Sequence, residues 1–163
     1  MSLVYTDFRL AGYRNLHTCK ELLSILDSCD ARKKKQILHN IYYLSGYIIE
    51  FCYKFALFSG LKASKFQDLG TFKDESFRKK WRDHSFERLK NICTEYKIVF
   101  SADIPYLGNN SIDKNLKELI RNWDVQMRYS IKLTKNTVLT EEDVINFVVL
   151  CEKILTKTDS NFS

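Results

Sequence analysis

The residues from 39 to 61, HNIYYLSGYIIEFCYKFALFSGL, form the apolar stretch that most constrains the fold. Apolar side chains recur there at steps of three and four residues, the spacing of one helix face, and further apolar positions widen that face. A helix that is apolar on nearly all sides must be enclosed by the rest of the protein. We therefore expect one long central helix, capped by Asp30 and closed by Gly60.

Glu50 and Lys54 interrupt this apolar stretch with opposite charges. They stand four positions apart, so their side chains are neighbours on one face of the helix and can pair. Burying charged groups costs free energy unless they are paired and hydrogen-bonded. The sequence therefore predicts that the two residues form a polar core that organises the surrounding helices.

The rest of the chain also favours helices, because only one Pro and five Gly occur among 163 residues. Apolar residues also recur every three or four positions in four shorter segments, which we predict to be helices. These helices lie at about 13–28, at 84–97, at 112–127 after a Ser111 cap, and from Thr140 onward. We expect an all-α protein, an antiparallel bundle of about five helices with one long central helix. It should form one domain over residues 1–157, followed by a flexible tail at 158–163.

Other sequence features exclude several classes of protein. Five cysteines at irregular spacing, without a CxxC pair, predict neither a disulfide framework nor a metal site. No cofactor is expected, since the sequence has no glycine-rich phosphate loop. The N-terminus has no signal-peptide pattern and the apolar run is interrupted by charges, so we expect a cytoplasmic protein without a membrane span. A net charge of +6 permits a polyanionic partner such as RNA.

Three segments resemble the HEPN superfamily, the helical domains named for nucleotide binding in higher eukaryotes and prokaryotes. Residues 43–57, YLSGYIIEFCYKFAL, are similar to its central helix, in which a Glu is followed by three spacers and a Lys. Residues 84–89, HSFERL, are similar to the start of a later helix, and residues 123–129 resemble a late helix that ends in an Arg-Tyr pair. The segments stand in the family's order and span about residues 35–130.

The resemblance implies a metal-independent ribonuclease of bacterial antiviral defence or toxin–antitoxin systems, frequently a symmetric dimer. Catalytic members carry an Arg followed four to six residues later by a His. Arg78 and His84 have five residues between them, although Lys79 stands where the family usually has Asn, Asp or His. His84 would then be the general acid or base, and Arg78 or Arg128 the phosphate-binding group. Tyr129 would join the polar core.

Two interpretations remain open. In the first, the protein acts on RNA or binds it, and four arginines contact the nucleic acid: Arg82, Arg88, Arg121 and Arg128. In the second, it is a non-catalytic interaction module that binds a second copy, an antitoxin or a separate nucleotidyltransferase through its long helix. His84 then caps or packs at a helix start, and Arg78 is a solvated charge. The tyrosines of the long helix fit a core or a dimer seam better than a base-stacking platform.

Overall fold

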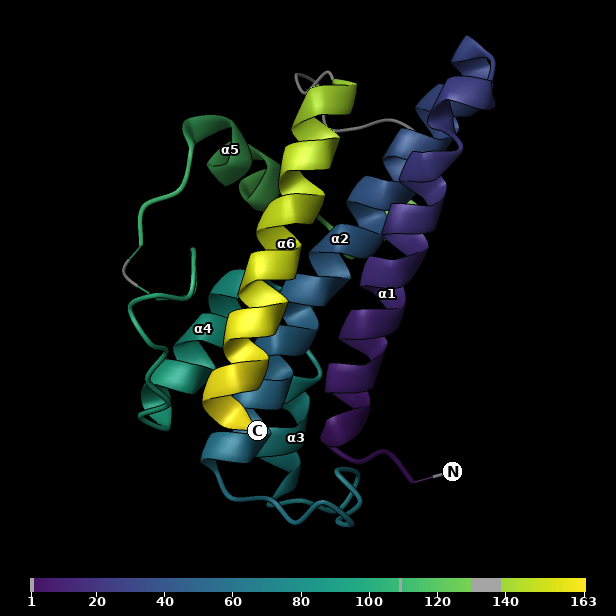
Figure 1. Ribbon diagram of the computed structural model, residues 1–163. Coiled ribbons are helices and arrows are strands. Elements are labelled where there is room, and N and C mark those ends of the chain that lie inside the picture. Colours follow the sequence, from purple (N-terminus) through teal and green to yellow (C-terminus); the bar gives the residue numbers. More distant parts are fainter. Residues whose placement is uncertain (1, 109, 130–138) are drawn as a thin grey trace.

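The computed structural model describes residues 2–108, 110–129 and 139–163, and in these residues the protein is all-α (Figure 1). The long helices α1, α2 and α6 pack side by side, and the shorter helices α3, α4 and α5 complete the bundle. The elements in order are α1 Thr6–Ser24, the 3₁₀ helix η1 Leu26–Ser28, α2 Ala31–Gly60, α3 Glu75–Trp81, α4 Phe86–Glu95, α5 Lys114–Asn122, the 3₁₀ helix η2 Val125–Tyr129, and α6 Glu141–Phe162. The predicted all-α bundle is confirmed.

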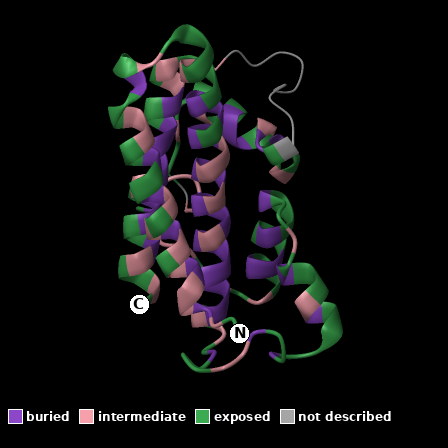
Figure 2. Ribbon diagram, turned by 90° about the vertical axis from the view of Figure 1, so that its right-hand side faces the viewer, coloured by how far each residue is buried: buried purple, intermediate pink, exposed green. Residues whose placement is uncertain are grey.

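Helix α2 is the buried axis of the bundle (Figure 2). The Asp30 side chain accepts a hydrogen bond from the Lys33 backbone N–H at 2.8 Å, and the helix ends at Gly60, as predicted. From Ile41 to Phe58 every residue is buried or half-buried, because α1, α4 and α6 surround the helix. Neither α2 nor any other described helix has the length and hydropathy needed to cross a membrane.

The sequence prediction also placed one end of α1 and one end of α5 wrongly. Helix α1 begins at Thr6 instead of residue 13, because Tyr5 and Phe8 are buried against aromatic side chains of α2. The predicted helix 112–127 is capped by Asp113 and stops at Asn122. Trp123 has an extended backbone there, with ψ 133°, and its indole N–H donates to the Tyr43 carbonyl oxygen at 3.0 Å. Trp123 therefore binds α2 and does not continue α5.

Residues 158–162 were predicted as part of a flexible tail, and this prediction is wrong, because they continue α6. Thr158 is fully buried. The Asp159 carboxylate accepts hydrogen bonds from Arg9 Nε at 2.5 Å, from Arg9 Nη2 at 2.9 Å and from the Tyr13 hydroxyl at 2.8 Å. Helix α1 therefore holds the end of α6 in place through partners about 150 positions away in sequence.

The Asp159 contacts predict a pH dependence of stability. Burial alone would raise the pKa of Asp159, but hydrogen bonds from Arg9, Ser163 and Tyr13 hold it below its ordinary value of 3.8. The unfolded chain therefore binds more protons in acid, so the contribution is present above about pH 4 and is lost as pH falls through the folded-state pKa. We expect Asp159→Asn to lower the free energy of unfolding by about 1 kcal/mol at neutral pH and by almost nothing at about pH 2. Urea unfolding followed by circular dichroism measures both values, and an equal loss at the two pH values would contradict this assignment.

Candidate functional site

The charged pair of α2 lies inside the bundle. Only 1% of Glu50 and 4% of Lys54 is exposed, and Lys54 Nζ donates to Glu50 Oε1 at 2.7 Å. The ammonium also lies 5.8 Å from the ring centroids of both Phe8 and Trp81, where aromatic faces attract a cation. The pair is thus formed within one helix and enclosed by apolar rings.

The second oxygen of Glu50 faces His84, just before α4. His84 Nδ1 lies 3.0 Å from Glu50 Oε2. A carboxylate that is paired with a lysine can only accept hydrogen bonds, so Nδ1 is the donor in this contact. Because 49% of the His84 side chain is exposed, Nε2 is the nitrogen that remains for a ligand. The Tyr47 ring stands edge-on to the imidazole at 6.2 Å between centroids.

Lys54, Glu50 and His84 therefore form a chain of contacts from the core to the surface. A carboxylate that binds one imidazole nitrogen fixes the tautomer and orientation of the ring. It also stabilises the imidazolium that forms when the other nitrogen takes up a proton. This arrangement holds the His84 ring with one nitrogen bound and the other toward the surface, a geometry that suits acid–base chemistry.

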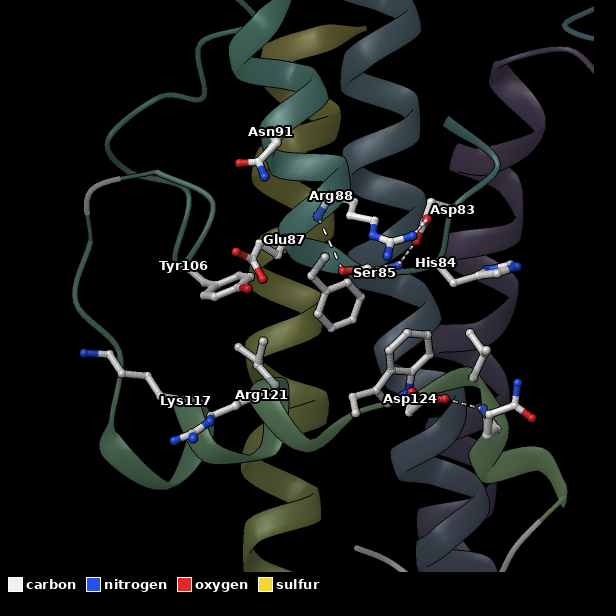
Figure 3. Close-up of a pocket in the computed structure, with 15 residues that line it drawn as sticks. Asp83, His84, Ser85, Glu87, Arg88, Asn91, Tyr106, Lys117, Arg121 and Asp124 are labelled. Carbon is white, nitrogen blue, oxygen red and sulfur yellow. Dashed lines mark hydrogen bonds and ion pairs between the residues drawn. The ribbon is translucent and has the colours of Figure 1, made fainter. Parts of the chain in front are cut away.

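A pocket of about 1010 Å³ opens beside His84, and we call it the α4–α5 pocket (Figure 3). At its apolar floor the rings of Phe86 and Trp123 are stacked, with centroids 4.8 Å apart and an interplanar angle of 9°. His84 lies on one side of the close-up, and Lys117 and Arg121 on the opposite side. The pocket is lined by residues 83–88, Asn91, Tyr106, Lys117, Ile120, Arg121 and residues 123–126.

Two of the predicted nucleic-acid-binding arginines line this pocket. Arg88 Nη1 donates to Asp83 Oδ2 at 2.6 Å. Burial would raise the pKa of Asp83, but the Ser85 backbone N–H and the Arg88 guanidinium hold it below its ordinary value. Arg121 lies on α5 with its Nη1 3.6 Å from Glu118 Oε1, in an exposed pair. The structure thus brings Arg88, Arg121 and His84 to one pocket.

The other predicted site residues do not line the pocket. Arg78 lies on α3, where its Nη1 donates to the Lys73 carbonyl oxygen at 2.6 Å. The Arg82 guanidinium carbon lies 5.6 Å from the centroid of the Trp81 ring. Arg128 is exposed on η2, and Tyr129 ends that element, but the Tyr129 side chain lies outside what the structure describes.

Arg78 and His84, the predicted catalytic pair, form no hydrogen bond with each other in the structure described. Helix α3 ends at Trp81 and α4 begins at Phe86, so the two residues belong to separate segments. Arg78 binds the backbone that precedes α3, whereas His84 binds α2.

Eight polar residues that line the pocket were not among the predicted site residues: Asp83, Ser85, Glu87, Asn91, Tyr106, Lys117, Asp124 and Gln126. Lys117 and Arg121 stand four positions apart on α5, and this spacing was a readable sign that they share a face. Tyr106 gave no comparable signal. It has a φ of 63°, in the left-handed region, which a non-glycine residue adopts only where its surroundings hold it there.

Comparison with known protein families, with curated proteins and with solved structures gives no match for this chain. The resemblance to the HEPN superfamily therefore stays a prediction that rests on the three sequence segments. Among the described residues, no group of three or more His, Cys, Asp or Glu side chains is arranged to hold a metal ion.

Proposed function

We propose that the protein is a HEPN-like RNA-acting protein that binds RNA at the α4–α5 pocket and cleaves it without a metal ion. The observation that carries the proposal is the 3.0 Å contact between Glu50 Oε2 and His84 Nδ1, which leaves Nε2 of a half-exposed imidazole at the pocket. The proposal includes the setting that the resemblance implies, a cytoplasmic role in bacterial defence or a toxin–antitoxin system.

His84 would act as the general base. Nε2 accepts the proton of a ribose 2′-hydroxyl while the 2′-oxygen attacks the adjacent phosphorus and the bond to the 5′-oxygen breaks. The 5′-oxygen leaves with a proton from solvent, and the product strand ends in a cyclic phosphate. Glu50 stabilises the imidazolium formed in this step, and the cations that line the pocket, Arg88 and Arg121, attract the RNA backbone.

The alternative function is a dimeric interaction module that binds its partner through the long helix. The burial of α2 weighs against this function, because no residue from Ile41 to Phe58 is exposed. A second copy of the chain, an antitoxin or a nucleotidyltransferase would therefore have to bind the outer helices or the exposed first turns of α2. We retain the homodimer as part of the proposal, since a partner subunit is one route by which Arg78 could reach His84.

The test is an RNA cleavage assay in EDTA with a mixture of structured and single-stranded RNA. We expect cleavage by the wild type and a rate at least tenfold lower for His84→Ala, because general acid–base groups contribute about 10²–10⁴-fold. The control is His17→Ala, which removes a largely exposed histidine of α1. Arg78→Ala should cleave like the wild type if each subunit acts alone.

Each alternative outcome has a definite meaning. If the wild type does not cleave, or if His84→Ala cleaves equally fast, the catalytic proposal is wrong. Loss of cleavage in Arg78→Ala would show that Arg78 reaches the site, and a mixture of the Arg78→Ala and His84→Ala proteins would then test for a site shared between two subunits. Absence of RNA binding at low salt would overturn the RNA proposal as a whole.

A further inference from the structure

We infer that the α4–α5 pocket holds a guanine nucleotide of the bound RNA, with Glu87 binding the base and Lys117 and Arg121 binding a phosphate. This inference rests on the proposed function and adds to it the base that the site selects. The observation behind it is that polar side chains from two different helices line the pocket.

The two helices present different sets of polar side chains to the pocket (Figure 3). On α4, Glu87 and Asn91 stand four positions apart and supply a carboxylate and an amide, whereas Arg88 on the same helix is paired with Asp83. On α5, Lys117 and Arg121 have the same spacing and supply two cations. Within the described ranges neither Glu87 nor Lys117 forms a salt bridge, although Glu87 is close enough to Arg88 for their charges to interact. A ligand that fits carries hydrogen-bond donors at one end and negative charge at the other.

The floor between these groups suits a flat ring. Phe86 and Trp123 are stacked there, and both are 7% exposed. Ile120, which is 4% exposed, extends the apolar surface. Tyr106 lines the pocket from the loop that follows α4, held in its left-handed conformation. A volume of about 1010 Å³ admits a nucleotide together with part of the next one along the strand.

Guanine is the base that matches a carboxylate. Its Watson–Crick edge carries two adjacent donors, N1–H and the N2 amino group, which can meet the two oxygens of Glu87 in parallel. Adenine and cytosine offer an amino donor beside an acceptor nitrogen, and uracil offers one N–H between two carbonyl groups. The Lys117 ammonium and the Arg121 guanidinium suit the phosphate, and Arg121 can bind two of its oxygens at once.

The test uses fluorescence anisotropy with labelled oligouridine probes that contain one central guanine, inosine or adenine. We expect the wild type to bind the guanine probe at least tenfold more tightly than the adenine probe, with inosine between them because it lacks the N2 amino group. Glu87→Gln should reduce the preference for guanine over adenine below threefold. Glu95→Gln is the matched control, because Glu95 lies on the same helix but pairs with Lys80 outside the pocket.

A double variant, Lys117→Ala with Arg121→Ala, separates the two proposals. It should weaken binding of all probes by a similar factor and reduce the dependence of affinity on salt. If this occurs but the wild type binds all three probes equally, the guanine assignment is wrong and the RNA proposal stands. If no probe binds at low salt, both proposals are wrong. A preference for guanine that persists in Glu87→Gln would overturn the role of Glu87.

Discussion

Replacement of Lys54 by methionine is expected to lower the free energy of unfolding by about 3–5 kcal/mol, the usual effect of removing one partner from a buried ion pair. Glu50 is 1% exposed, and without the ammonium its carboxyl group loses its buried counter-ion and has His84 as its remaining side-chain partner. Methionine has nearly the length of lysine, so the rings of Phe8 and Trp81 keep a packing partner. Urea unfolding followed by circular dichroism measures the loss.

A double variant, Glu50→Gln with Lys54→Met, gives the decisive comparison. It removes both charges, so it should recover most of the stability lost in Lys54→Met, because replacing a whole buried pair is often neutral. Lys80→Met, which removes the exposed partner of Glu95, should change the stability little. If the double variant is as unstable as Lys54→Met, the damage comes from packing and the explanation by an uncompensated charge fails.

Helical periodicity accounts for the part of this site that lies within α2. Two residues four positions apart must be neighbours on a helix, and Glu50 and Lys54 are in contact. The contact between Glu50 and His84 spans 34 positions and depends on how α4 packs against α2, which no local pattern reveals. The long central helix could be predicted from local sequence too. A helix with apolar residues on nearly all sides must be buried, but its sequence does not show which helices cover it.

The spacing of Arg78 and His84 carries less information than the spacing within α2. Residues six apart on one helix point in different directions, and here the chain leaves the helix after Trp81 and starts a new one at Phe86, so the spacing does not fix how the two side chains are oriented. Asp83 stabilises this break, because its carboxylate accepts from the Ser85 N–H at 2.8 Å and from the Arg88 guanidinium. The pocket residues Glu87 and Lys117 lie on α4 and α5, which a long loop connects. The position of one helix relative to the other in space cannot be derived from either helix sequence alone.

The close approach of Trp123 to α2 leads to the second large effect. Gly46 is buried in α2, and a Cβ atom at this position would overlap the Trp123 indole, including its nitrogen. Gly46→Ala should therefore displace the indole, break its hydrogen bond to the Tyr43 carbonyl oxygen and disturb its stacking on Phe86. We expect a loss of about 3 kcal/mol from overpacking and the lost hydrogen bond, and a fall in Tm on the order of 10 °C in a thermal melt.

Gly12→Ala is the matched control, because Gly12 is also a buried glycine inside a helix. A Cβ atom there would lie 3.0 Å from Leu155 Cδ1, at the end of a side chain that can move. Alanine favours the helix over glycine by about 1 kcal/mol, so this variant should remain within about 1 kcal/mol of the wild type. Equal losses in the two variants would contradict a specific role for the Trp123 contact. Loss of stability in Gly46→Ala alone would show that the contact of Trp123 with α2 is specific. Because Trp123 follows the end of α5 and lines the α4–α5 pocket, this variant should also lose affinity for RNA.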